Sequence, residues 1–170
     1  MIKRVGDIVL IQLSDIDSNI YIIGDVAIDS GTGFNFTRLM TALSMLKRDL
    51  GDIKLVINTH EHFDHIGGNG YFTNARIWAH EDAVPVMEDA DTEISRADFF
   101  GGSLHPMTVE KKLKDGETVK IGKREFRVIH TPGHTPGSMC LYCEKEKLLI
   151  SGDTVFADGV GITDIPGGDP

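Results

Sequence analysis

The hydrophobic pattern of the chain alternates short apolar runs with turn residues. In the first third, runs rich in β-branched residues predict strands, and one stretch with apolar residues at helical spacing, ended by Gly51, predicts a helix. The expected strands cover 7–13, 19–23, 26–28 and 54–58, and the expected helix covers 36–50.

The middle of the chain predicts mixed structure and the last third predicts mainly strands. In the middle we expect a strand over 76–79, short helices over 80–89 and 93–100, and a loop over 101–106. In the last third the expected strands cover 117–121, 125–130, 138–143 and 147–151. Two strand-rich halves without a linker predict one α/β domain over 1–170, in which two sheets meet at a shared edge with helices outside.

Composition and charge narrow the classes of function. The 170 residues are 41% hydrophobic and 25% charged, with a formal net charge of −9. An acidic chain lacks the basic patch of a nucleic-acid-binding protein, and no apolar run reaches the length needed to span a membrane. The N-terminus does not resemble a signal peptide, because Asp7 interrupts its apolar run. We therefore expect a cytoplasmic protein with a small-molecule substrate.

The segment Thr59-His-Glu-His-Phe-Asp-His65 carries the strongest chemical signal. Four metal-type ligands, namely His60, His62, Asp64 and His65, follow a predicted strand and precede Gly67-Gly68, which is expected to let the backbone turn tightly. Imidazole and carboxylate together suit zinc, non-haem iron or manganese. This segment predicts a metal site.

Two later segments repeat this layout of a strand followed by a ligand-type residue. His134 lies in the Pro- and Gly-rich loop after the predicted strand 125–130, and Asp153 follows the strand 147–151. Each segment alone is more typical of a turn than of a metal site.

Taken together and in this order, the three segments resemble the metallo-β-lactamase superfamily, with its motif His-x-His-x-Asp-His, then a single His, then a single Asp. The resemblance extends over nearly the whole chain, including the opening strands and Asp29-Ser-Gly31. It implies an αββα four-layer sandwich with a metal centre at one edge of the two sheets. A bridging aspartate, with no cysteine at that place, is similar to the glyoxalase II-like branch rather than to the β-lactamases that degrade antibiotics.

The resemblance also implies a set of ligands. By position, the first metal would be held by His60, His62 and His134, and the second by Asp64 and His65, while Asp153 would bridge the two. Two cations about 3.5–4 Å apart can share a water, lower its pKa and hold a substrate oxygen. We therefore expect a zinc-type centre with one or two ions, or with iron or manganese, that uses a metal-bound hydroxide to hydrolyse a small ester, thioester or lactone. Asp64 is the expected catalytic residue, because it would orient the hydroxide or pass its proton to the leaving group.

One departure from the family pattern leaves alternatives open. Members supply a last histidine to the second metal from a strand after the bridging aspartate, whereas here no histidine follows His134 before the chain ends at Pro170. The expectation is a C-terminally incomplete sandwich, whose uncovered sheet edge could pair two copies. The alternatives are an oxygenase like the persulfide dioxygenases, with one non-haem iron on His60, His134 and Asp153, and a non-catalytic module stabilised by a metal or completed by a partner.

The remaining candidate residues have plainer interpretations. His80 is expected at a helix start and His105 in a loop. Asp29 and His130 are either a turn residue and a buried strand-end residue, or hydrogen-bond partners that orient ligand side chains. Cys140 and Cys143, three apart on one predicted strand, are expected to be ordinary buried thiols rather than a redox or zinc pair.

Overall fold

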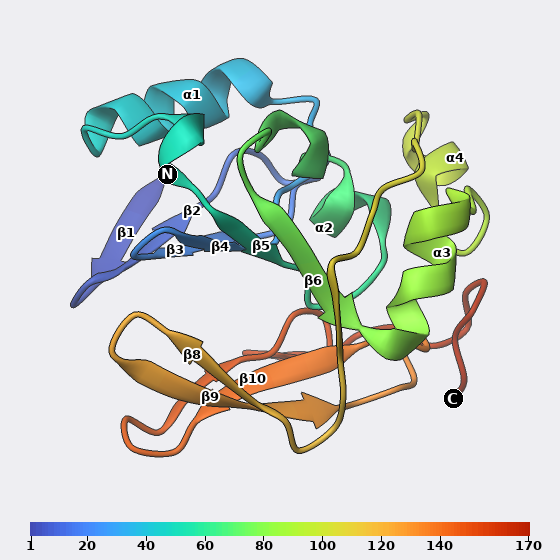
Figure 1. The fold of residues 1–170 in the computed structure, drawn as a ribbon. Coiled ribbons are helices and arrows are strands. Elements are labelled where there is room, and N and C mark those ends of the chain that lie inside the picture. The colour runs from blue at the N-terminus through green and yellow to red at the C-terminus, as the bar shows by residue number, and fades with distance from the viewer.

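A computed structural model describes all residues, 1–170, and contains two principal β-sheets that face each other (Figure 1). The first sheet has seven strands in the order of the chain. They are β1 (Ile2–Val5), β2 (Ile8–Ile11), β3 (Ile20–Ile23), β4 (Val26–Ile28), β5 (Leu55–Ile57), β6 (Arg76–His80) and β7 (Lys111–Leu113). The pairs from β1 to β4 are antiparallel and those from β4 to β7 are parallel.

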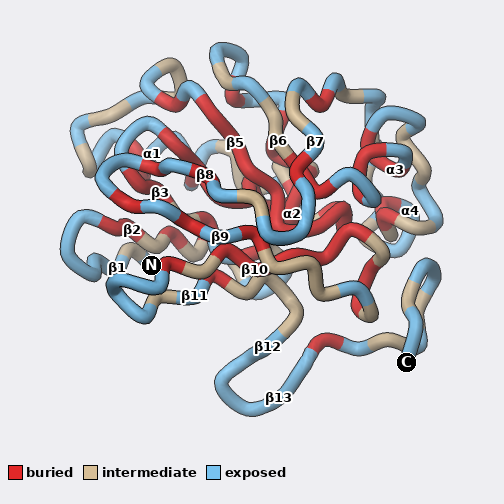
Figure 2. The backbone as a smooth tube through the Cα atoms, turned by 60° about the horizontal axis from the view of Figure 1, so that its bottom comes forward, coloured by how far each residue is buried: buried red, intermediate tan, exposed pale blue.

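The second sheet is antiparallel throughout and has four strands in the order β11-β10-β9-β8. These are β8 (Thr118–Ile121), β9 (Arg124–His130), β10 (Met139–Cys143) and β11 (Leu148–Ile150). A small hairpin of β12 (Val155–Phe156) and β13 (Gly159–Val160) follows, and Figure 2 shows it as an exposed loop that projects from the body of the molecule.

Helices cover the face of the first sheet that points away from the second (Figure 1). The longest is α1 (Phe36–Met45). The shorter ones are α2 (Phe63–Ile66), α3 (Val84–Asp89) and α4 (Ala97–Phe100), with 3-10 turns at Leu50–Asp52, Asn69–Tyr71 and Glu81–Ala83. No helix is long and apolar enough to cross a membrane.

Two apolar clusters explain why the central strands are continuous apolar runs. Ile28 of β4 and Ile57 of β5 pack against Phe126 and Leu141 between the two sheets, in a cluster of 15 buried residues. Alternate residues of the same strands, such as Val56, pack with α1 on the other face. A strand covered on both faces needs apolar side chains in both directions, which gives sequences such as Leu-Val-Ile rather than alternation.

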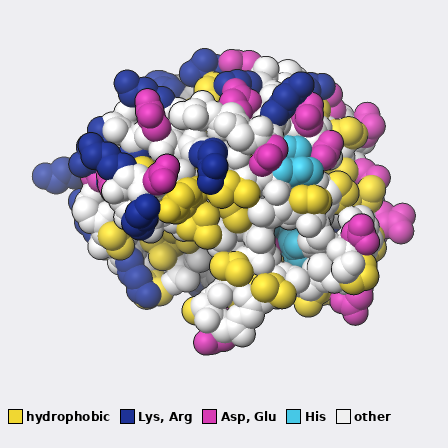
Figure 3. All heavy atoms as spheres, turned by 90° about the horizontal axis from the view of Figure 1, so that it is seen from below, with side chains coloured by type: hydrophobic (Ala, Val, Ile, Leu, Met, Phe, Trp, Pro, Cys, Tyr) yellow, Lys and Arg dark blue, Asp and Glu magenta, His cyan; other side chains and the backbone are white.

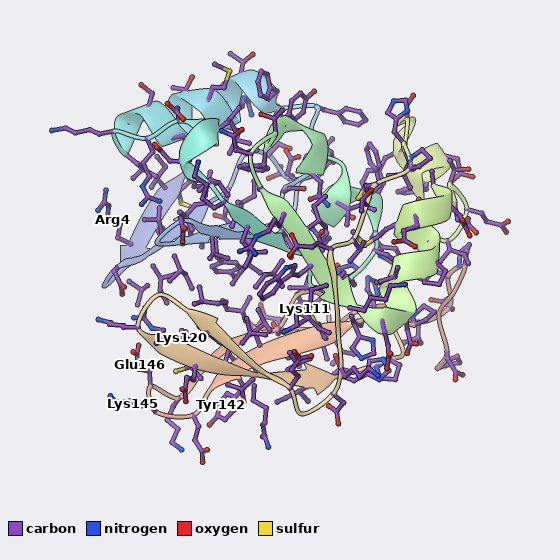
Figure 4. All side chains as sticks on the ribbon, viewed as in Figure 1. Arg4, Lys111, Lys120, Tyr142, Lys145 and Glu146 are labelled. Carbon is purple, nitrogen blue, oxygen red and sulfur yellow. The ribbon has the colours of Figure 1, made fainter.

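The second sheet shows the opposite pattern, because only one of its faces is covered. Along β9, Arg124, Phe126 and Val128 are buried while Glu125 and Arg127 are exposed. This alternation is typical of a sheet with one solvated face. Figure 4 shows Tyr142 and Lys145 on the side of this sheet away from α1. Residues 1–170 thus form the helical layer and both sheets of the expected sandwich, with no helix on the outer face of the second sheet.

The predicted elements are confirmed in kind, but several boundaries differ. The helix predicted over 36–50 ends at Met45, because Lys47 adopts a left-handed conformation with φ of 56°. The backbone N–H of Arg48 donates to the carbonyl of Leu43, and that of Lys47 to Ser44, which is the Schellman arrangement that closes a helix. Glycine usually occupies this left-handed position, which is why the sequence points to Gly51 as the end of the helix. Here Lys47 adopts the left-handed conformation instead, and the helix ends before Gly51.

Strands β1 and β7 and the β12–β13 hairpin were not predicted. β1 has mostly exposed side chains, and β7, Lys-Lys-Leu, buries only its last residue well. The sequences of β1 and β7 lack apolar alternation, because these two strands lie at the edges of the first sheet and each pairs with one neighbour only. Backbone pairing with a neighbour, which no local pattern encodes, makes them strands.

Packing between the sheets gives a testable expectation. Phe126 is fully buried, whereas Phe156 on the hairpin is 49% exposed. We expect Phe126→Ala to lower the free energy of unfolding by about 3–5 kcal/mol, because it leaves a cavity in the core. Phe156→Ala should change it little. Urea denaturation followed by circular dichroism measures both, and equal losses would contradict this account of the core.

An ion pair ties β9 to the β1–β2 turn and makes stability depend on pH. Two N–H groups of Arg124 donate to Asp7, at 3.1 and 2.7 Å, and a third donates to Glu146 at 2.9 Å. The hydrogen bond from Arg124 lowers the pKa of Asp7 from 3.8 to about 2. A carboxyl whose pKa is lower in the folded state stabilises the fold above its unfolded pKa and loses that contribution as the pH falls.

We therefore expect Asp7→Asn to lower the free energy of unfolding at pH 7. The difference from the wild type should shrink between about pH 4 and pH 2, where the wild-type carboxyl gains its proton. Urea unfolding at a series of pH values and low salt measures it. A difference that stays constant down to pH 2 would refute the ion-pair explanation.

Candidate metal centre

The predicted ligand residues lie in loops at one edge of the two sheets. Asp29 follows β4, the segment 58–65 follows β5, His134 lies between β9 and β10, and Asp153 follows β11. Strands β4 and β5 are parallel, so their carboxyl ends share an edge; β9 and β11 flank β10 and end on the same side. In Figure 3, histidine side chains reach this face in two places: one lies beside acidic side chains, and the other lies in a hollow bordered mainly by uncharged atoms.

Three histidines converge on one point. One ring nitrogen from each of His60, His62 and His134 lies within 4.8 Å of the others, and all three residues are buried. The Nε2 atoms of the three rings have no hydrogen-bond partner. Buried polar atoms are nearly always paired, so three unpaired imidazole nitrogens pointing to one place are what an ion site requires.

Neighbouring groups fix the orientation of two of these rings. His134 donates from Nδ1 to the carbonyl of Ile162 at 2.7 Å, which leaves its Nε2 free as an acceptor. His60 Nδ1 lies 3.2 Å from Thr59 Oγ1. Such partners hold a ligand ring at the correct angle.

A second group surrounds His65. Its Nε2 lies 3.2 Å from Asp153 Oδ1 and 3.5 Å from Asp64 Oδ2, and Asp153 Oδ2 lies 3.5 Å from His134 Nε2. Asp153 therefore stands between the two groups, at the position expected of a bridging ligand. His60, His65 and Asp153 also form a compact set with ligand atoms within 4.8 Å of one another.

Asp29 holds His65 from the other side. Its Oδ2 lies 2.8 Å from His65 Nδ1, and its two oxygens accept from the hydroxyl and the backbone N–H of Thr59. Asp29 is buried and adopts a left-handed conformation with φ of 61°. Asp29 is thus both part of a turn and a hydrogen-bond partner of His65, a candidate ligand.

Burial keeps two rings of the histidine group, His60 and His62, neutral. Burial lowers the pKa of His60 well below its ordinary value and that of His62 to about 3, and neighbouring imidazoles lower both further. Both rings therefore stay unprotonated, which is the form that binds metals.

The group around His65 is charged. Burial alone would lower the pKa of His65, but the surrounding carboxylates, Asp29 first, raise it well above its ordinary value. Burial raises the pKa of Asp64. Burial also acts to raise the pKa of Asp153, but the hydrogen bond and the charge of His65, with smaller contributions from neighbouring imidazoles, together outweigh it and lower that pKa. Several carboxylates around one cationic group suit a site for positive charge.

The glycines after the motif have a different role from the expected one. Gly67 has an ordinary helical φ of −60°, so it closes α2 without an unusual turn. A Cβ at Gly67 would lie 2.3 Å from the carbonyl oxygen of Thr32. Absence of a side chain lets α2, which carries Asp64 and His65, pack against the turn that carries Asp29.

The other candidate residues lie outside these groups. His80 caps the 3-10 turn after β6, accepting from the N–H of Asp82, and its ring stacks on that of His130 at 3.8 Å. His130 Nε2 donates to the carbonyl of Pro136 at 2.8 Å, so it contacts the loop of His134 rather than a ligand ring. His105 is exposed in a loop. Cys140 and Cys143 are free, buried thiols, as expected.

Several residues of the site were not identified from the sequence. Thr59 and Ile162 contact candidate ligand residues directly or through Asp29, and Glu61 is fully buried and lies between His60 and His62 in the sequence. Burial raises the pKa of Glu61 to about 7. The sequence does contain a signal for Glu61: it is a charged residue flanked by two histidines that are both expected to point into the site. The contribution of Ile162 comes from its backbone carbonyl, which leaves no signal in the sequence.

Comparison with known proteins identifies the family. The metallo-β-lactamase superfamily model matches residues 14–170. A probable metallo-hydrolase of Methanocaldococcus jannaschii is 36% identical over 159 residues, which cover 89% of this chain and 74% of that protein. The acyl-coenzyme A thioesterase MBLAC2 of Bos taurus is 32% identical over 162 residues, 84% of this chain and 58% of the relative. A hydroxyacylglutathione hydrolase of Rhodospirillum rubrum is 34% identical over 107 residues, 62% of this chain but 35% of the relative.

Solved structures agree. A crystal structure of the BLEG-1 B3 metallo-β-lactamase has a TM-score of 0.77 and 30% identity, covering 99% of this chain and 79% of the other. A structure of TTHA1623 in a di-iron-bound form has a TM-score of 0.76 and 28% identity, covering 95% of this chain and 79% of the other. The chain belongs to the metallo-β-lactamase superfamily, as its motifs predicted. It spans little more than half of the thioesterase and about a third of the hydroxyacylglutathione hydrolase.

Close packing beside His134 gives a prediction about Gly161. A Cβ at Gly161 would lie 2.1 Å from the carbonyl oxygen of Asp153 and 2.9 Å from His134 Nδ1, whereas one at Gly159 would meet nothing within 4 Å. We expect Gly161→Ala to displace the carbonyl of Ile162 and weaken metal binding about 10–100-fold, the usual cost of losing a partner that orients a ligand.

Gly159→Ala is the matched control, because it adds the same methyl group nearby, in the β12–β13 hairpin, without a clash. Metal affinity, measured by competition with a chromogenic chelator, should be unchanged in this variant. Equal affinity of the two variants would show that the approach of Gly161 to His134 is unimportant.

Proposed function

We propose that this chain is a metal-dependent hydrolase that cleaves thioesters and related small esters, in the manner of the glyoxalase II-like branch. The observation that supports it most is the set of three buried Nε2 atoms, on His60, His62 and His134, that converge without partners beside the carboxylate of Asp153. Imidazoles with carboxylates form the ligand set of hydrolytic metal centres.

The preference for thioesters rests on two relatives. One is named an acyl-coenzyme A thioesterase and another a hydroxyacylglutathione hydrolase. Both names specify an acyl group joined to the sulfur of a larger thiol. A shared acyl–sulfur bond with different thiols is consistent with a common reaction centre and a separate region that selects the thiol.

Different residues of the chain would have different roles in the reaction. A metal held by the three histidines, with a second near Asp64 and His65, would supply Lewis acidity and a water of lowered pKa. Asp64 and Asp153 are partly exposed, with side-chain exposures of 21% and 27%, so they face the position of a substrate. We assign to Asp64 the transfer of a proton to the leaving group, because burial raises its pKa and makes it the better proton carrier of the two. Asp29 keeps His65 oriented throughout.

The metal is proposed to be zinc, with one or two ions per chain. Iron is the principal competitor, since the related TTHA1623 structure is described as di-iron-bound. The same donor set also suits manganese, so the ligands alone do not select the ion.

A mononuclear iron oxygenase is the second candidate, favoured by one specific arrangement. His60, His65 and Asp153 form a group of two histidines and one carboxylate, the ligand set of non-haem iron oxygenases. Our expectation from the sequence had His134 in place of His65. One iron per chain together with substrate-dependent oxygen uptake would favour this candidate over the hydrolase.

Thioester hydrolysis with a metal requirement is the direct test. We expect the purified chain to contain zinc and to cleave an acyl-coenzyme A or a hydroxyacylglutathione faster than a chromogenic β-lactam. A chelator should abolish turnover and added zinc should restore it. Asp64→Asn should lower kcat about 100–10,000-fold, the usual range for a lost general acid.

Asp158→Asn is the control for this variant, because Asp158 is an exposed aspartate on the β12–β13 hairpin. Its turnover should equal that of the wild type. A zinc-loaded chain that hydrolyses none of these substrates would contradict the proposal and favour the non-catalytic module.

A further inference from the structure

Glu61 is a buried carboxylate that the proposed reaction does not use. It lies between His60 and His62 in the sequence, and none of its surface is exposed. A carboxylate is costly to bury unless it accepts hydrogen bonds. The partners of Glu61 therefore indicate why it is there.

Both partners of Glu61 belong to the loop of His134. The Thr135 hydroxyl donates to Glu61 Oε2 at 2.9 Å, and the backbone N–H of Gly137 donates to Oε1 at 3.1 Å. One side chain of the β5–α2 segment thus binds the β9–β10 loop with both carboxylate oxygens. A bidentate contact fixes orientation as well as distance.

The part of the loop that Glu61 contacts is itself rigid. Thr135 N–H donates to the Ser138 hydroxyl at 3.1 Å, the two hydroxyls lie 2.9 Å apart, and Ser138 N–H donates to the Thr135 carbonyl. A turn closed by these bonds moves as one piece. Because Thr135 follows His134 directly, the contact of Glu61 with Thr135 sets the backbone position from which the His134 ring extends.

Convergence of the three histidines needs such a connection. His60 and His62 come from the loop after β5, whereas His134 comes from the other sheet. The bond from His134 to Ile162 sets the ring orientation but joins the loop to the hairpin region, not to β5. Glu61 is the side chain that joins the two ligand loops.

We propose that Glu61 is a positioning residue that clamps the His134 loop to the His60–His62 segment and thereby holds the first metal site in its binding geometry. This role rests on the metal centre of the proposed function. It concerns binding of the ion rather than the reaction, so it can be tested without turnover.

Two substitutions test the clamp. Glu61→Ala leaves the Gly137 N–H and the Thr135 hydroxyl buried without their acceptor. Glu61→Gln keeps the size of the side chain and one acceptor oxygen, and the Thr135 hydroxyl can turn to accept from the amide. We expect zinc affinity, measured by chelator competition, to fall about 10–100-fold in Glu61→Ala, the usual effect of removing a partner that orients ligands. Glu61→Gln should lie between Glu61→Ala and the wild type.

Cobalt provides a readout that general loss of stability does not change. The visible absorption of cobalt bound in place of zinc depends on ligand geometry, so Glu61→Gln should shift the bands while the protein remains folded. Arg124→Gln is the control: it breaks the ion pairs to Asp7 and Glu146 at the far end of β9 and should lower stability without changing the cobalt spectrum or zinc affinity.

The outcomes separate the two proposals. Unchanged zinc affinity and cobalt bands in both Glu61 variants would overturn the clamp. Equal losses of affinity in Arg124→Gln and Glu61→Gln would also overturn it, because they would reflect stability alone. A wild type that binds zinc but hydrolyses nothing contradicts the hydrolase and leaves the clamp to be judged by the variants. A wild type that binds no metal contradicts both.

Discussion

The whole site depends on keeping three imidazole nitrogens buried and unpaired at one point. Such an arrangement is unfavourable by itself, because a buried acceptor without a donor costs free energy. The fold maintains it by giving other ring nitrogens of the site their own partners. The carbonyl of Ile162 accepts from Nδ1 of His134, and the carboxylate of Asp29 contacts Nδ1 of the neighbouring His65. A bound cation removes the cost, so metal binding and the stability of these loops are expected to be linked.

Two different sheets supply the site, and this explains the network around it. The first sheet has apolar residues on both faces, which leaves its strand ends as the places where polar groups can gather. The second sheet joins it through a shared core and through contacts at the ligand edge, such as the bond from the N–H of Met139 to the carbonyl of Thr59. Residues that carry no ligand atom, above all Asp29 and Glu61, hold the loops in register with each other.

Charge is distributed unequally within the site. His60 and His62 are neutral, whereas the group around His65 combines one cationic ring with several carboxylates. A divalent ion that binds the first group displaces no proton from His60 or His62. An ion that binds the second group competes with the proton on His65. His65 must lose its proton before its nitrogen can act as a ligand, so metal binding near His65 is expected to weaken as the pH falls.

The sequence by itself determined the family and the α/β class and predicted the candidate ligand residues, because the motifs combine unusual residue types with strand-terminal positions. It also predicted the central strands, whose burial on both faces produces continuous apolar runs. Tertiary structure alone decided the edge strands β1 and β7, the helix end at Lys47, and the partners of Asp29, Glu61 and His134. These features depend on backbone groups and on contacts between residues far apart in the chain, such as Glu61 with Gly137. The amino-acid sequence does not show which partner a backbone N–H or carbonyl binds.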